Sequence, residues 1–171
     1  PMLSFSWEFA PVTTLYGGYH RGLSPHIVRD VLETETGYIA PKKEVGDNFQ
    51  IGVRSKAVRG FTFDAAYFHS DIRNYQFGEA FQSDFGDRVF SSLDKVRFDG
   101  FELSARVDSN AFTDSAWNVY GEGVYTFVHS KIVKGTEEGG VNVAGNRVPE
   151  SMRHTANLTL GVQHDSGFDA S

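Results

Sequence analysis

The chain has a strong two-residue period, in which apolar and polar side chains alternate over short segments. This period is typical of β-strands with one apolar and one polar face. It predicts seven strands, at 3–9, 14–20, 49–54, 61–70, 101–107, 117–128 and 156–163. No segment keeps a helical period for long, and residues 27–33 have room for one short helical turn inside a loop. The sequence therefore predicts an all-β protein.

The connections between these strands alternate in length. Short connections are expected at 10–11, 55–60 and 108–116, a further one is expected to begin at 165–171, and long polar connections are expected at 22–47, 71–95 and 133–153. An up-and-down transmembrane β-barrel shows this alternation, because its periplasmic turns are short and its extracellular loops are long. The pattern predicts an antiparallel meander of about seven strands, with all the long loops at one end.

The alternation within the strands is compatible with two architectures. The apolar phase includes Ile51, Leu103, Val119 and Leu158, and the polar phase includes Arg54, Glu102, Arg106 and Glu122. In a membrane barrel the apolar phase contacts lipid and the polar phase faces the lumen. In a soluble β-sandwich the apolar phase is buried against a second sheet. The sandwich, acting as a binding module for carbohydrate or protein, is the alternative to the barrel.

The aromatic residues favour the barrel. Those of the apolar phase form two groups, Trp7, Phe9, Phe61, Phe63 and Trp117 near the short turns and Tyr19, Phe49, Tyr67, Tyr125 and Phe127 near the long loops. Aromatic rings concentrate at the two lipid–water interfaces, because Tyr and Trp are partly apolar and partly polar. Aromatics that fill the wide ends of a sandwich core are the alternative explanation.

Composition and charge exclude several functions. Aromatic residues make up 14% of the chain, and 18 Gly against 5 Pro also fits β-structure. The net charge of −6 disfavours a nucleic-acid-binding protein, and the absence of Cys excludes disulfides and cysteine–zinc sites. The six His show no metal-ligand spacing, and no nucleophile-elbow motif frames a Ser. We expect no enzymatic activity, no resident metal and no cofactor.

Three segments resemble one protein family. They are Leu-Tyr-Gly-Gly-Tyr-His-Arg-Gly-Leu-Ser-Pro at 15–25, Val-Arg-Phe-Asp-Gly-Phe-Glu-Leu at 96–103, and Gly-Asn-Arg-Val-Pro at 145–149 followed by Arg-His-Thr at 153–155. In order and spacing they are similar to segments of the TonB-dependent outer-membrane receptors of Gram-negative bacteria. The chain departs from the family at Met152, where many members carry a Pro. The pattern is nearest to the ferric-citrate and siderophore branch, with haem, cobalamin and sugar importers as alternatives.

The resemblance implies a specific fold and location. Family barrels have about 22 strands around a plugged lumen. Residues 1–171 are therefore expected to be a fragment of such a barrel, without the plug domain and the remaining strands. The implied location is the cell outer membrane, with lipid around the barrel. The implied function is import of a ferric siderophore or ferric-citrate-type chelate, with energy from TonB acting through the plug.

The long loops supply the candidate ligand contacts. Ferric chelates of this kind are usually anionic, and basic and aromatic side chains hold them through charge-assisted hydrogen bonds. The candidates in or beside the long loops are Arg29, Arg73, Tyr75, Arg88 and Arg147.

Overall fold

The computed structural model describes residues 1–24, 32–34, 37–39, 42–82, 88–136 and 141–171. Its strands are β1 (Met2–Ala10), β2 (Thr13–Ser24), β3 (Leu32–Thr34), β4 (Gly37–Ile39), β5 (Glu44–Ser55), β6 (Phe61–Gln82), β7 (Arg88–Asp108), β8 (Trp117–Lys134), β9 (His154–His164) and β10 (Asp169–Ala170). A short 3₁₀ helix, η2 (Ser109–Ala111), follows β7. None of the described segments is a helix long and apolar enough to span a membrane.

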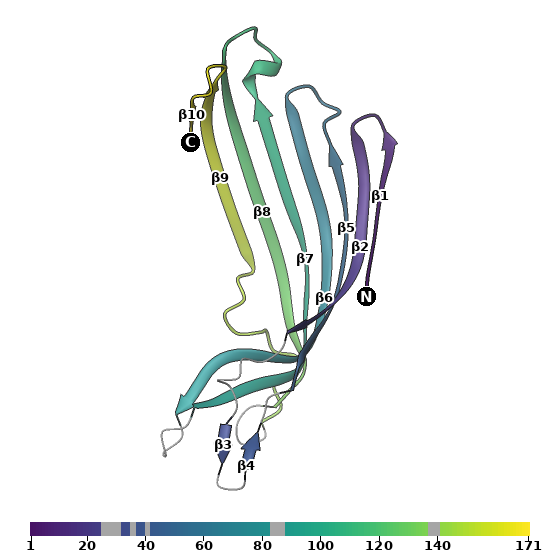
Figure 1. Ribbon diagram of the computed structural model, residues 1–171, viewed down its shortest axis with the longest axis vertical. Helices are drawn as coiled ribbons and strands as arrows, with labels where there is room; N and C mark the ends of the chain where they lie inside the picture. Colours follow the sequence, from purple (N-terminus) through teal and green to yellow (C-terminus); the bar gives the residue numbers. More distant parts are fainter. Residues whose placement is uncertain (25–31, 35–36, 40–41, 83–87, 137–140) are drawn as a thin grey trace.

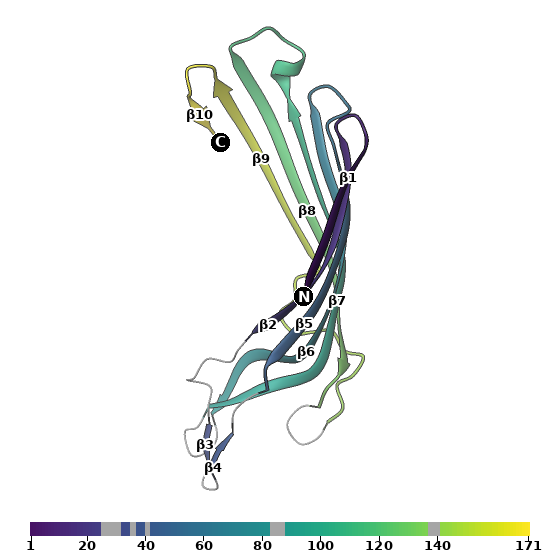
Figure 2. The same cartoon turned by 45° about the vertical axis from the view of Figure 1, so that its right-hand side comes forward.

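Eight of the strands form one antiparallel sheet. Their order is β1-β2-β5-β6-β7-β8-β9-β10, so each strand pairs with its neighbour in the chain apart from the separate β3–β4 pair. Figures 1 and 2 show the sheet as a single curved layer. The predicted all-β meander is confirmed, with the two-residue strand β10 as an addition to the seven predicted strands.

The short and long connections lie at opposite ends of the sheet. The β1–β2, β5–β6 and β7–β8 connections are together at the upper end in Figure 1, and the longer connections are at the lower end. The predicted orientation of the loops is confirmed. At the short-turn end Gly60 has a φ of +68°, and a Cβ there would lie 2.6 Å from the ring of Phe112, so the turn requires glycine.

The long connections contain more strand than the sequence predicts. The prediction of a loop over 71–95 is wrong, because β6 continues to Gln82 and β7 begins at Arg88. The expected loop over 22–47 likewise includes β3, β4 and the first residues of β5. Of the possible helical turn at 27–33, residues 32 and 33 belong to β3 and residues 27–31 lie outside the described residues. Backbone N–H and C=O groups keep the two strands paired there, although the sequence lacks the apolar–polar alternation that marks a strand.

The register places the apolar residues on one face. Phe5, Gly17, Ile51, Tyr67, Phe101 and Phe127 are successive partners across six strands. Ile51, Leu103, Val119 and Leu158 share this face, and their exposed fractions are 49%, 42%, 59% and 74%. Arg54, Glu102, Arg106 and Glu122 lie on the opposite face. The predicted strand phase is therefore confirmed, and the apolar face carries no second layer of described residues.

The buried apolar core lies elsewhere. It consists of Leu93, Val96, Ile132, Val143 and Val148, at the long-loop end of the sheet. Most of the sheet thus has no core of its own and remains a single wall.

Candidate functional site

The polar face of the wall carries hydrogen-bonded charges, the first of them close to the β5–β6 turn. Arg54 Nε lies 2.6 Å from Asp64 Oδ2, and the Tyr16 hydroxyl donates to Asp64 Oδ1 at 2.5 Å. The Tyr16 ring lies over Gly52, where a Cβ would come within 2.5 Å of it. The glycine therefore makes room for the aromatic ring that holds Asp64.

A second polar network lies beside the β7–β8 turn. Arg106 Nη2 lies 2.8 Å from Asp108 Oδ1, which also accepts a hydrogen bond from Asn118 Nδ2 at 2.7 Å. The Arg106 guanidinium lies 3.9 Å from the centre of the Tyr120 ring, and its Nη1 lies 3.8 Å from Glu122 Oε2. A lumenal wall can carry such charges because they remain hydrated and paired.

Burial identifies the polar face as the inner one. Ala66, Asn118, Tyr120 and Ser130 on this face are buried, although most of its length carries no covering layer. The apolar face shows the opposite, with large side chains half exposed or more. Curvature crowds the side chains of a concave face, so we infer that the polar face is concave.

At the long-loop end, the segment after β8 packs against this inner face. Gly145 N–H donates to the Ile132 carbonyl, and Ile132 N–H donates to the Asn146 carbonyl, both at 2.8 Å. Val143 and Val148 then complete the core with Val96 and Ile132. The segment thus extends the wall and covers part of the inner face at this end.

Two predicted ligand contacts lie at this packed segment. Tyr75 packs against the core, with its ring centre 5.9 Å from that of Phe98, and burial raises the pKa of its hydroxyl. The nearby carboxylates of Glu44 and Glu150 raise this pKa further. Arg147 Nε donates to Ser151 Oγ at 3.3 Å, beside a shallow hollow of about 630 Å³ lined by residues 147–154.

The other predicted contacts lie apart from this pair. Arg73 is on β6 and its Nη2 lies 2.8 Å from Asp47 Oδ2, on the apolar-phase face of the sheet. Asn74, which lies between Arg73 and Tyr75, has a φ of +54°. The side chains of Arg73 and Tyr75 point to different faces of the sheet on either side of it. Arg88 begins β7 and pairs with Gln82, in a stretch where the structure describes the backbone only. Arg29 lies outside the described residues.

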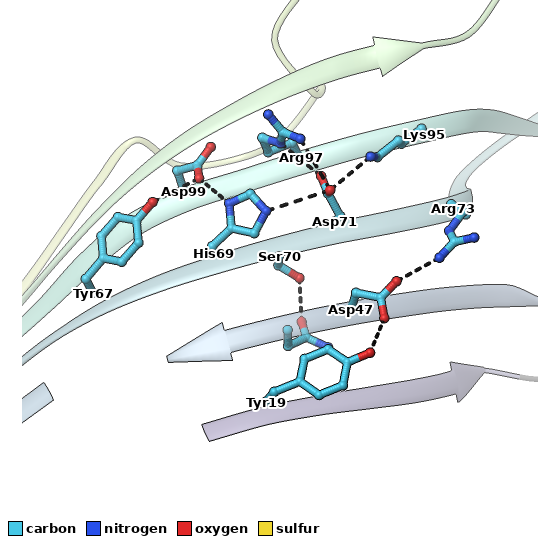
Figure 3. A network of polar contacts seen from close by, with 11 residues as sticks. Tyr19, Asp47, Tyr67, His69, Ser70, Asp71, Arg73, Lys95, Arg97 and Asp99 are labelled. Atoms are coloured by element: carbon cyan, nitrogen blue, oxygen red, sulfur yellow. Dashed lines mark hydrogen bonds and ion pairs between the residues drawn. The ribbon is translucent and has the colours of Figure 1, made fainter. Parts of the chain in front are cut away.

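A charged cluster that the sequence analysis missed lies beyond the aromatic residues of the apolar face (Figure 3). Asp47 binds Arg21 and Arg73, and Asp71 binds Lys95 and Arg97. These acids lie two residues beyond Phe49 and His69, and so outside the aromatic belts that would bound a membrane-spanning part. The arginine hydrogen bonds hold the pKa of Asp47 well below its usual range and lower that of Asp71 to about 2. One sequence signal could have revealed this cluster. The positions of the apolar phase continue beyond the last aromatic residue of each strand, and there they carry charged side chains.

Almost the whole chain matches a known protein family. The family described as TonB dependent receptor-like, beta-barrel, matches residues 1–170. The chain belongs to this family. A comparison with curated proteins finds no match. TonB-dependent receptors are outer-membrane transporters rather than enzymes, and their barrels explain a single-layer sheet with an uncovered apolar face.

The family membership also bears on the alternatives. A β-sandwich would cover the apolar face with a second sheet, whereas the described strands form one layer and the small β3–β4 pair. In the described ranges, no three His, Cys, Asp or Glu side chains are grouped closely enough to hold a metal ion. In this chain the candidate site is the inner face and the long-loop end, where polar side chains can meet a ligand.

Proposed function

We propose that residues 1–171 form part of the closed barrel of a TonB-coupled importer in the outer membrane. The observation that carries the proposal is the division of one curved sheet into an uncovered apolar face and a hydrogen-bonded polar face. In the described chain β1 and β10 are the two edge strands. An open edge in lipid leaves backbone groups without hydrogen bonds, so further strands are required to close the wall.

The proposed cargo is a ferric siderophore or a ferric-citrate-type chelate. The resemblance of segments 15–25, 96–103 and 145–155 to that branch supports this choice. An anionic chelate requires basic groups at the entrance, and Arg147 offers an exposed guanidinium beside the hollow at 147–154. A plug domain inside the barrel is proposed to pass the force from TonB to the bound chelate.

Uptake of labelled iron tests the proposal. The protein is expressed from its own reading frame in a Gram-negative strain that lacks its own ferric-chelate receptors, with and without TonB. We expect uptake of ferric citrate or of a ferric siderophore that depends on both the protein and TonB. Import of haem, cobalamin or a sugar in place of ferric chelates would refute the proposed cargo, and uptake without TonB would refute the coupling.

Variants of the same protein test the ligand contacts. Arg147→Ala is expected to raise the apparent KM for the chelate about tenfold or more, since one charge-assisted hydrogen bond contributes roughly 1.5–3 kcal/mol. Tyr75→Phe removes only the hydroxyl and is expected to have a smaller effect. Arg59→Ala, at the short-turn end, is the control and should leave uptake unchanged. Arg29 and Arg88 are candidates for the same assay, as is Arg73, whose position beside Asp47 predicts a weaker effect.

A further inference from the structure

The charged cluster on the apolar-phase face is organised across five strands. Arg21, Asp47, Asp71, Arg97 and Lys131 are successive register partners, and Arg73 and Lys95 are partners in the next row. With Asp99, the outward cluster has five cations and three carboxylates. It is therefore positive, although the chain as a whole carries a net charge of −6.

The carboxylates hold the cations in place, and the cations keep N–H donors that these ion pairs do not use. Asp47 accepts one hydrogen bond from Arg21 Nε and one from Arg73 Nη2. A guanidinium has five N–H donors, and the side chains of Arg21 and Arg73 are 42% and 52% exposed. Several fixed donors can therefore reach a further anion from outside.

An apolar groove of about 350 Å³ lies directly beside the cluster. It is lined mainly by Leu3, Phe5, Phe49, Ile51 and the tyrosines Tyr19 and Tyr67. Both tyrosine hydroxyls donate to carboxylates of the cluster, Tyr19 to Asp47 at 2.6 Å and Tyr67 to Asp99 at 3.1 Å. Figure 3 shows these two tyrosines pointing to Asp47 and Asp99, so the groove that they line is continuous with the cluster.

The spacing between the charged cluster and the apolar groove matches that between the headgroup and the acyl chain of an amphiphile. Side chains two residues apart on a strand are separated by about 7 Å, so the charged row lies about 7 Å from the Tyr19–Phe49 row and about 13 Å from the Ile51 row. The charged row is on the long-loop side of the aromatic residues, which is the extracellular side of an outer-membrane barrel. It therefore meets the headgroup region of the outer leaflet.

We infer that this face binds an anionic lipid of the outer leaflet, with its phosphate groups on the arginine and lysine cluster and an acyl chain in the apolar groove. The inference rests on the proposed orientation of the apolar face toward lipid. Phosphate suits the cluster because arginines bind it with several charge-assisted hydrogen bonds. The excess of cations explains the preference for a headgroup with net negative charge.

Binding of a defined lipid to the purified protein tests the inference. The protein is expressed from its own reading frame, extracted from the outer membrane, delipidated in detergent and titrated with diphosphorylated lipid A by native mass spectrometry. The double variant Arg21→Ala/Arg97→Ala is expected to raise the apparent Kd at least about tenfold, equivalent to 1.4 kcal/mol. Arg54→Ala is the matched control, because Arg54 forms the same type of ion pair at 2.6 Å on the opposite face.

The other arms separate the inference from alternatives. Lipid A without its phosphates should bind weakly, and inorganic phosphate should not compete at equal concentration. An unchanged Kd in the double variant, an equal loss in Arg54→Ala, or equal binding of inorganic phosphate would overturn it. If the double variant does not assemble, Lys131→Ala leaves the ion pairs of Asp47 and Asp71 intact and is expected to weaken lipid binding several-fold. Lipid binding is measured on the purified protein and iron uptake is measured in cells. Failure of the proposed import function and failure of lipid binding are therefore distinguishable.

Discussion

Asp47 and Asp71 are direct register partners on β5 and β6, yet each carboxylate is bound by its own two cations. Like charges directly opposite one another on a sheet are destabilising. Here the strands on either side supply the compensation, because Arg21 comes from β2 and Lys95 and Arg97 come from β7. The ion pairs of the cluster therefore link four neighbouring strands at the edge of the aromatic belt.

Acid should weaken the protein partly through Asp71. Hydrogen bonding to Arg97, with a further contribution from Lys95, lowers the pKa of Asp71 to about 2. A carboxyl group with a lowered folded-state pKa contributes stability above its unfolded pKa of about 4, and this stability is lost as the pH falls toward 2. Asp71→Asn should therefore lower the urea midpoint at pH 7 and flatten its fall between pH 4 and pH 2. Urea unfolding in detergent measures both, with Asp114→Asn in the short turn as the control.

Charge on the apolar face should impair assembly in the membrane. Leu158, which is 74% exposed, lies on that face, and Asn157 lies on the polar face one residue away. Leu158→Arg is expected to cost roughly 2–4 kcal/mol near the bilayer midplane and to reduce the amount assembled in the outer membrane. Asn157→Arg should assemble normally, as should Glu102→Gln. Equal assembly of Leu158→Arg and Asn157→Arg would show that the apolar face does not contact lipid.

Labelling of introduced cysteines provides a direct check of the same phase. The chain has no native Cys, so single cysteines can be read without background. A lipid-soluble thiol reagent should label Cys at positions 103 and 158 but not at position 102. Labelling at 102 together with protection at 103 would mean that the assignment of the two faces is inverted.

Gly52 should be intolerant of a side chain. A Cβ at this position would lie 2.5 Å from the Tyr16 ring and 2.9 Å from the Ala65 carbonyl oxygen. Gly52→Ala must displace the ring and its hydrogen bond to Asp64, which we expect to cost roughly 1–3 kcal/mol of the free energy of unfolding. Gly123→Ala is the control, because no atom outside its chain neighbours lies within 4 Å of a Cβ there. Urea unfolding of both variants in detergent compares them.

The segment after β8 should depend on its buried valine. Val148 is 2% exposed in the core with Val96 and Ile132, whereas Val141 is 60% exposed. Val148→Ala should cost roughly 1–3 kcal/mol locally, and Val148→Asp should release the segment from the wall. Limited proteolysis is expected to cut Val148→Asp near residues 141–153 faster than the wild type. Val141→Asp should be cut at the wild-type rate, and equal rates for both variants would refute a structural role for the core.

The sequence by itself determined the seven main strands of the sheet, without their full length, and the two faces of the wall. Side-chain direction alternates with every residue of a strand, so the composition of each face can be read locally, without knowing which strands pair. The alternation of short and long connections likewise predicted which strand ends lie together. For the same reason the opposite phases of Leu103 and Glu102 were predictable before any partner was known.

Only the tertiary structure decided the outward charged cluster and the packed segment after β8. The cluster requires the register of five strands, since Arg21 and Lys131 are more than a hundred residues apart in the chain. The segment requires Val148 to meet Val96, a contact that no local period specifies. The extension of β6 and β7 was also hidden, because residues 71–95 show no apolar–polar alternation although their backbones remain paired. Register and long-range packing depend on distant parts of the chain, and local patterning carries no record of them.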